Sequence, residues 1–290
     1  QKCDVVILET GLGGTYDSTN ACGVPDVTVI AKIGFDHMAI LGDTLAKIAA
    51  EKAGIIKHGT ALVLESQEKE AMDVLNKAAE RADIKTTKVV NLDEIRILPQ
   101  KDGKQCFSYA GYDAVTMKML GVHQYENAVA AMLAAELFFE KYFAGKKNVP
   151  ERKALQHAIR EGIDRTQWMG RMELVSNDPF FLMDGAHNSN GVEALKKSLE
   201  TMYPDEKFHF IMGVMADKDY GEMIRELLPL ALDFKTVTVE SERALQGEAL
   251  ADCIRAKGIP AEAYRNLEDV LPDFSKSSAE KTVAFGSLYF

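Results

Sequence analysis

Acidic and imidazole side chains follow the first two apolar runs of the chain, where a parallel sheet would bring them together. Glu9 ends the run 5–8, and Asp36 and His37 follow the run 27–30. In open parallel sheets, ligands bind at the carboxyl ends of the strands. A carboxylate and an imidazole at neighbouring strand ends could therefore bind a metal or move a proton. The spacing is equally compatible with Glu9 capping a turn and His37 satisfying a hydrogen bond in the core.

Lys52 lies on the apolar face of a helix that the sequence predicts from about Thr44 to Lys57, with Asp43 or Thr44 as its cap. That face carries apolar residues at helical spacing: Leu45, Ile48 and Ala49. Burying an ammonium group is costly unless it is paired or neutral, so burial would favour the uncharged, nucleophilic amine. The alternative is a lysine whose ammonium group reaches solvent or pairs with Glu9 or Asp36.

The glycine-rich stretch 11–20 (GLGGTYDSTN) is not a phosphate-binding loop of the Walker A type. It lacks the Gly-Lys-Ser/Thr ending, and no GxxxxGKS/T segment occurs anywhere in the chain. It does not match GxGxxG either. A glycine-rich turn after a strand fits any tight connection. The sequence therefore offers no loop of the kind that cradles the β- and γ-phosphates of ATP.

Further polar segments follow apolar runs in the second half of the chain. Asp184-Gly-Ala-His-Asn188 stands between a predicted strand and a predicted helix, where an acid could hold a ribose and the helix N-terminus could face a phosphate. Gly170-Arg171 lies just upstream, and Asp217-Lys218-Asp219 follows the next strand. Each segment could be a plain turn or a cap, but the first has more polar groups than such a turn needs.

Strand and helix patterns alternate in two series, which predicts an α/β protein of two domains, residues 1–167 and 168–290. In the first we expect a buried strand at 5–8, strands at 27–30 and 61–64, and a helix at 69–82. Short antiparallel strands between 95 and 120 and helices at 125–142 and 151–162 follow. In the second we expect strands at 180–183, 208–212, 236–239 and 282–285 with helices between them, one at 192–202, as in a Rossmann-like domain.

Composition excludes several classes of protein. The net charge of −10, from 44 acidic and 34 basic residues, is unlike that of nucleic-acid-binding proteins. The four cysteines form no CxxC pair, so they indicate free thiols in a reducing cytosol rather than zinc or disulfides. No apolar run is long enough to span a membrane. Because an apolar run begins almost at residue 1, we expect the start of the natural protein to be missing.

Several segments occur together, and in order, in one known family. The segments ETGLGGTYDSTN, IGFDHMAILGDTLAKIAAEKAGIIK, HQYENA, MGRME, DGAHN, DKD and the terminal GSLYF resemble folylpolyglutamate synthase and dihydrofolate synthase, of the Mur ligase superfamily. The resemblance covers nearly the whole chain. It implies part of a Mur-ligase central ATPase domain, mostly a parallel sheet with helices, and a C-terminal Rossmann-like ligase domain. The implied enzyme adds L-glutamate to the terminal carboxylate of folate with ATP, through an acyl phosphate.

The resemblance also implies residue roles. Glu9 and His37 match magnesium ligands, and Lys52 matches a lysine that is carbamylated, which agrees with its apolar helix face. Mn²⁺ can substitute, because histidine is an uncommon ligand of Mg²⁺. The remaining matches are residues that contact ATP or the glutamate side: Asn127, Arg171, Asp184 and His187 for ATP, and Asp217 and Lys218 for glutamate. Of all these, Lys52 and His187 are the candidates for catalysis.

The chain departs from the family at two points. Thr15 stands where the family usually has arginine, which changes the local contacts to anions. The first ~100 residues of the family, with the phosphate-binding loop and much of the pterin pocket, have no counterpart here. We therefore expect the 290-residue chain alone to be inactive. We expect a cytoplasmic monomer acting on folate and glutamate.

Three alternatives stay open at this point. The first is a dihydrofolate synthase or an enzyme with both activities. The second is a catalytically dead protein that binds folate or a nucleotide. The third is a cell-wall Mur ligase, although the full EKAGIIK and DGAHN wording favours the folate branch.

Overall fold

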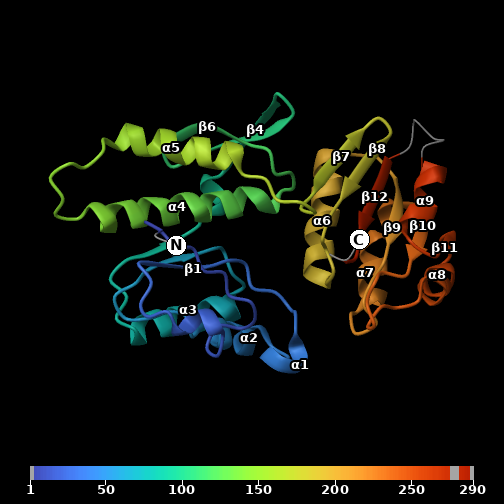
Figure 1. Cartoon of the computed structure of the whole chain (residues 1–290), viewed down its shortest axis with the longest axis horizontal. Helices are drawn as coiled ribbons and strands as arrows, with labels where there is room; N and C mark the ends of the chain where they lie inside the picture. The colour runs from blue at the N-terminus through green and yellow to red at the C-terminus, as the bar shows by residue number, and fades with distance from the viewer. Residues whose placement is uncertain (1–2, 275–280, 288–290) are drawn as a thin grey trace. The chain divides into compact units, whose positions relative to one another are not determined.

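The computed structural model describes residues 3–274 and 281–287. The chain forms two compact units (Figure 1). The first contains residues 1–99, 106–116 and 125–164, and the second contains residues 100–105, 117–124 and 165–290. Within the described part of the chain, no helix is both long and apolar enough to cross a membrane.

The first unit is built on a parallel sheet in the order β1-β2-β3, formed by Val27–Ile30, Ala61–Leu64 and Thr87–Val89. Leu62 and Leu64 of β2 join an apolar cluster with Ile48 of α2 and Leu75 of α3. Helices α2 (Leu45–Ala53) and α3 (Lys69–Arg81) therefore cover one face of this sheet. The central strand β2 is apolar and mostly buried, as expected for a strand covered on both faces, whereas β3 at the edge is exposed.

Helix α4 (His123–Phe143) lies on the opposite side of β1 from α2 and α3 (Figure 1), and it runs antiparallel to β2. Contacts near its two ends fix this direction. The Lys141 ammonium donates to the carbonyl of Gly59, just before β2, at 2.9 Å. The Glu126 carboxylate accepts from the amide of Ser66, just after β2, at 2.6 Å. The helix is thus tied to both ends of the central strand.

The remaining elements before residue 170 are shorter or lie outside this sheet. Strands β4, β5 and β6 form a separate sheet whose neighbours are joined by two-residue turns, which fit only antiparallel pairs. The Tyr112 hydroxyl of β6 donates to Glu136 of α4 at 2.9 Å. The bounds of these elements are η1 Ser18–Ala21, α1 Met38–Leu41, η2 Leu92–Glu94, β4 Arg96–Lys101, β5 Lys104–Tyr109, β6 Tyr112–Met117 and α5 Arg152–Arg165.

The second unit holds a six-stranded sheet in the order β11-β10-β9-β12-β8-β7. All neighbours are parallel except β7, which pairs antiparallel with β8 at one edge. Strand β12, the last in the chain, fills the place between β8 and β9. The bounds are β7 Glu173–Asn177, β8 Phe180–Met183, α6 Ser189–Met202, β9 Phe208–Met212, α7 Tyr220–Leu227, η3 Leu228–Leu230, β10 Ala231–Val237, α8 Gly247–Arg255, β11 Ala261–Tyr264, α9 Leu267–Phe274 and β12 Lys281–Phe285.

Alternation along β9 separates two apolar layers in this unit. Phe208 and Phe210 pack with the apolar faces of α6, α7 and α8, whereas Ile211 packs in a smaller cluster with Val270 of α9. Phe210 is fully buried, and its ring stacks on that of Phe234 with centroids 5.2 Å apart. The largest apolar cluster among the described residues therefore lies under one face of the six-stranded sheet.

Most predicted elements are present, and the largest error is at the start. Residues 5–8 are not a strand, and Ile7 is 93% exposed. Apolar β-branched residues favour extended backbone, but a strand also needs a paired neighbour. No described strand pairs with this segment. The helix predicted to reach Lys57 ends at Ala53, and the strand predicted at 236–239 is Ala231–Val237. The last three residues of GSLYF lie outside the described residues.

Replacing Phe210 by alanine should lower the free energy of unfolding by about 3–5 kcal/mol, because it removes a fully buried ring and leaves a cavity. Urea unfolding followed by fluorescence and circular dichroism measures this. Leu232→Ala is the control, because Leu232 is 43% exposed and should lose less than about 1 kcal/mol. Equal losses in the two variants would contradict the described core.

Candidate functional site

The carboxyl ends of β8, β12 and β9 are joined by backbone hydrogen bonds in the second unit. The amide of Asp184 donates to Ala284 at 2.9 Å, and the amide of Gly286 donates to Ala186 at 2.8 Å. Gly286 has a φ of 110°, and a Cβ there would lie 2.4 Å from the carbonyl oxygen of Gly213. The three chain segments approach this closely at the point where the strand order reverses, which is where open α/β sheets bind ligands.

Asp184 connects the DGAHN turn to the Gly170-Arg171 loop. One carboxylate oxygen accepts from the amide of Met172 and the other from the amide of Ala186, both at 2.8 Å. The carbonyl of Gly170 accepts from the amide of Gly185 at 2.7 Å. Burial raises the pKa of Asp184, against the effect of the two amides and of nearby Arg171 and His187. Asp184 therefore holds the backbone of both predicted nucleotide-contacting segments.

The residues that follow Asp184 prepare the start of α6. His187 Nδ1 lies 2.8 Å from the carbonyl of Gly185, so a proton on that nitrogen would fix the orientation of the ring. Asn188 caps α6 by accepting from the amide of Gly191 at 2.8 Å. The predicted combination of a polar turn with a capped helix start is present, and Arg171 lies close enough to Asp184 to act on its charge.

Asp217, Lys218 and Asp219 follow β9 as a surface turn. Asp219 caps α7 by accepting from the amide of Glu222 at 3.0 Å. Asp217 is exposed and lies 3.8 Å from the Arg243 guanidinium. The Lys218 amide donates to the carbonyl of Met215 at 3.2 Å. The cap role of Asp219 accounts for part of this motif, and the glutamate-side role of Asp217 and Lys218 stays a prediction.

His123 is a candidate that the sequence did not single out. It begins α4, and its Nε2 lies 3.0 Å from the side-chain nitrogen of Gln124. Burial, together with the charge of Arg171, lowers the pKa of His123 to about 4, so the ring is neutral near pH 7. The φ of Gly121 is 106°, and a Cβ there would lie 2.8 Å from the ring. A neutral imidazole thus lies within reach of the charge of a predicted nucleotide-contacting arginine.

In the first unit, the glycine-rich stretch packs against the end of α2. The amide and hydroxyl of Thr15 both donate to the carbonyl of Glu51, at 2.9 and 3.1 Å. The Asn20 side chain donates to the carbonyl of Gly54 at 3.1 Å. A Cβ on Gly14 would lie 2.7 Å from the Glu51 carbonyl oxygen. This stretch therefore caps the helix that carries Lys52, and Thr15 takes part in that cap.

Asp17 holds the glycine-rich stretch in shape. Its carboxylate accepts from the amides of Gly11 and Leu12 and from the amide and hydroxyl of Thr19, at 2.5–3.1 Å. These hydrogen bonds, led by the Thr19 hydroxyl, lower the pKa of Asp17 to about 2. Asp17 therefore has a structural role within the glycine-rich stretch.

The three predicted metal ligands lie in different local settings. Glu9 is exposed in an irregular segment, and Lys52 is half-buried in the last turn of α2. His37 has a φ of 49°, which is uncommon for a residue with a side chain, and its ring lies 3.9 Å from the carboxylate of Asp36. Among the described residues, no three His, Cys, Asp or Glu side chains are grouped to hold a metal ion. The ligand set stays a prediction.

Asn127 lies exposed on α4, next to a buried acidic feature that the sequence did not reveal. Glu65, directly after β2, is 3% exposed. Its carboxylate accepts from the amide of Lys32 at 2.6 Å, and neighbouring Glu126 accepts from the amide of Ser66 at 2.6 Å. Burial, helped by the charge of Glu126 and opposed by the Lys32 amide, raises the pKa of Glu65 to about 7. Sequence patterns missed Glu65 because an alternation of apolar and polar residues along a strand does not indicate that an acid at its end is buried.

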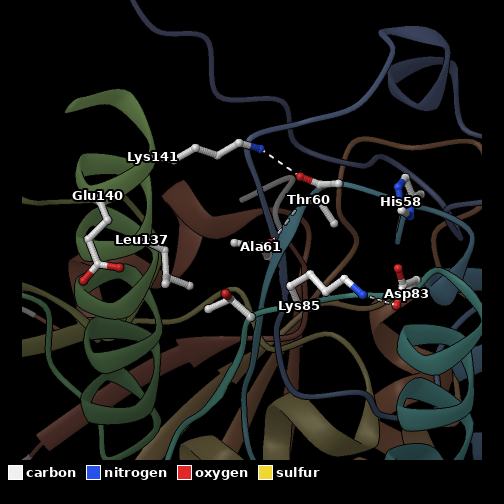
Figure 2. A pocket seen from close by; sticks show the side chains of 10 residues that line it. His58, Thr60, Ala61, Asp83, Lys85, Leu137, Glu140 and Lys141 are labelled. Atoms are coloured by element: carbon white, nitrogen blue, oxygen red, sulfur yellow. Dashed lines mark hydrogen bonds and ion pairs between the residues drawn. The ribbon is translucent and has the colours of Figure 1, made fainter. Parts of the chain in front are cut away.

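A pocket of about 430 Å³ lies at the opposite, amino end of β2 in the first unit (Figure 2). Three of its charged side chains, Asp83, Lys85 and Lys141, already have partners. Lys85 pairs with Asp83 at 2.5 Å, and Lys141 donates to Gly59. The lining residues are His58, Gly59, Thr60, Ala61, Asp83, Lys85, Thr86, Leu137, Glu140 and Lys141. None of the predicted site residues belongs to this pocket.

Replacing Asp184 by asparagine should lower the free energy of unfolding by about 1–3 kcal/mol, because an amide side chain can accept with one atom only and leaves a buried backbone N–H unpaired. Thermal or urea unfolding measures the loss. Asp217→Asn is the matched control and should stay within about 0.5 kcal/mol, because Asp217 is exposed. If Asp184→Asn left the free energy of unfolding unchanged, the two amides would not depend on this carboxylate.

Comparison with known proteins connects this geometry to one family. Residues 1–135 match the Mur ligase middle domain, and residues 170–285 match the Mur ligase glutamate ligase domain. The dihydrofolate synthase/folylpolyglutamate synthase of Bacillus subtilis is 34% identical over 300 residues, with 100% of this chain and 66% of that protein covered. The protein of the same name from Mycobacterium tuberculosis is 34% identical over 266 residues, covering 86% of this chain and 51% of that protein.

A solved structure agrees with these sequence matches. Mycobacterium tuberculosis folylpolyglutamate synthase complexed with ADP superposes with a TM-score of 0.79 at 28% identity, covering 96% of this chain and 64% of that chain. The chain thus spans about two thirds of the length of this structure and of the Bacillus subtilis relative. With both Mur ligase domains matched in order, the chain belongs to the Mur ligase superfamily, in the branch of folylpolyglutamate and dihydrofolate synthases.

Proposed function

We propose that this chain is the larger part of an ATP-dependent ligase that adds L-glutamate to the terminal carboxylate of folate. The observation that carries the proposal is the Asp184 clamp, which holds the Gly170-Arg171 loop and the DGAHN turn at the switch point of the sheet. The names of the relatives support the reaction class, and one solved relative holds ADP. Because two relatives are named as enzymes of both kinds, dihydrofolate synthesis is the second candidate.

The proposed reaction activates a carboxylate that amines do not attack. A carboxylate oxygen of folate displaces ADP from the γ-phosphorus of ATP, giving an acyl phosphate. The amine of glutamate then attacks the acyl carbon, and the tetrahedral intermediate expels phosphate to form the amide. The protein's part is to position reactants and neutralise charge. In this proposal Arg171 and the amides at the start of α6 bind the nucleotide, Asn127 contacts it, and His187 orients it or moves a proton.

Mg²⁺ is the cation expected at the first unit. In the proposal Glu9, His37 and a carbamate on Lys52 hold it, with Mn²⁺ as a substitute. Carboxylate and carbamate oxygens are hard donors that suit Mg²⁺, and the exposure of Glu9 and His37 leaves both accessible. When bound, the cation would supply charge neutralisation for the phosphates. Asp217 and Lys218 are proposed on the glutamate side.

Lys52→Ala in the full-length protein should lower kcat of the ligase by about 10²-fold or more, because the carbamate oxygens are lost. Acetate should restore part of the activity to Lys52→Ala, since a small carboxylate can occupy the vacated space. Lys52→Arg is the matched control and should be inactive without rescue, because its side chain fills that space. Full activity of either variant in the absence of acetate would rule out the carbamate.

The 290-residue chain by itself should not hydrolyse ATP, because it contains no loop that cradles the β- and γ-phosphates. A coupled assay for ADP release, with and without folate and glutamate, measures this. Robust turnover by the chain alone would refute the expectation. Turnover that appears only when the chain is joined to a phosphate-loop segment of a relative would support the proposed ligase over a catalytically dead binding protein.

A further inference from the structure

The buried carboxyl group of Glu65 lies where three parts of the first unit meet. Glu65 follows β2, and its backbone amide donates to the carbonyl of Ile30, the last residue of β1, at 3.0 Å. Its side chain accepts from the amide of Lys32 at 2.6 Å. On the α4 side, Glu126 accepts from the amide of Ser66. One short stretch, 65–66, thus joins the ends of two strands to the first turn of a long helix.

Among residues 3–274 and 281–287, no cationic side chain forms an ion pair with this carboxyl group. The charge of Lys32 acts on Glu65 less than that of Glu126 does, and the Lys32 ammonium lies 3.4 Å from Glu68 on the surface. The acid whose charge acts on Glu65 is Glu126, which is itself occupied by a backbone amide. Two like charges at a site with little water are strongly unfavourable, and one proton removes that penalty. The protonated group can also donate a hydrogen bond, which an ionised group cannot.

We infer that Glu65 is a positioning residue that carries a proton at neutral pH, and that the Glu65–Glu126 pair thereby holds the first turn of α4, with Asn127, against the ends of β1 and β2. The acidic latch formed by these two residues acts on the backbone and touches no substrate. Its link to the nucleotide depends on the proposed function, because Asn127 is an ATP contact only in that proposal. The stability of the latch does not depend on it.

The sign of the pH effect follows from the direction of the shift. The folded pKa of Glu65 is about 7, above its ordinary value of 4.5. The folded state therefore binds the proton more tightly than the unfolded state does. Its contribution to stability is complete below the ordinary pKa and is lost as the pH rises toward and through the folded value. The charged groups that act on Glu65 are Glu126 and Lys32.

The test compares Glu65→Gln with Glu68→Gln in urea unfolding of the whole chain between about pH 4 and pH 8.5. Glutamine copies the protonated acid, so near pH 8 Glu65→Gln should raise the folding equilibrium constant roughly tenfold or more over the parent. Near pH 4, below the pKa of the unfolded state, the increase should be less than about twofold. Glu68 is exposed, so Glu68→Gln should leave the pH dependence of the free energy of unfolding unchanged. If the free energy of unfolding changed with pH equally in Glu65→Gln and in the parent, the latch would be overturned.

Two further measurements separate the latch from packing and from the proposed function. A ¹³C NMR titration of the Glu65 carboxyl in the parent chain should show a midpoint near neutrality, and a midpoint near the ordinary value would overturn the protonation. In the full-length enzyme, KM for ATP should rise above neutral pH in the parent but not in Glu65→Gln, with kcat unaffected by the substitution. If Glu65 titrates near neutrality but KM for ATP does not rise above neutral pH in the parent, the positioning of Asn127 is refuted. The proposed ligase reaction is untouched by that result.

Discussion

Backbone amides that leave the carboxyl end of a parallel strand have lost their strand partner and need another acceptor. In this protein, acidic or amide side chains supply it at each site of interest. Asp184 joins two loops of the second unit, and Glu65 binds the loop after β1. Asp17 holds the glycine-rich stretch in the same way, although that stretch follows no described strand. The candidate site rests on these interactions, because they give the loops one backbone conformation before any ligand arrives.

Burial decides how the same interaction affects each acid. Asp17 is accessible to water and accepts four hydrogen bonds, which lower its pKa to about 2. Asp184 and Glu65 accept from amides as well, but burial outweighs those bonds and raises their pKa values. Asp184 has Arg171 nearby, whereas the charge that acts most strongly on Glu65 is that of a second acid, Glu126. The two units therefore hold their strand-end loops with opposite electrostatic surroundings, a cation in one and a like charge in the other.

Sequence patterns predicted what depends on local chemistry. The apolar runs of β1, β2, β8 and β9 are strands, Thr44 caps α2, and the polar turn after β8 precedes a capped helix. Sequence patterns failed where contacts between residues far apart in the sequence determine the structure. Residues 5–8 have the composition of a strand but no described pairing partner. The sequence predicts a helix that reaches Lys57, but the helix ends at Ala53, where the glycine-rich stretch packs against its last turn. The buried position of Glu65 depends on α4, sixty residues later, so no local pattern indicates it.

The central claim is that buried acidic side chains, and not loop composition, fix the backbone at the strand ends. Native-state amide hydrogen exchange of the whole chain tests it most directly. The amides of Lys32, Met172 and Ala186 should exchange as slowly as those of the core strand β9, because their acceptors are released only when the unit unfolds. Exchange as fast as that of Met169, whose side chain is 83% exposed, would contradict the account.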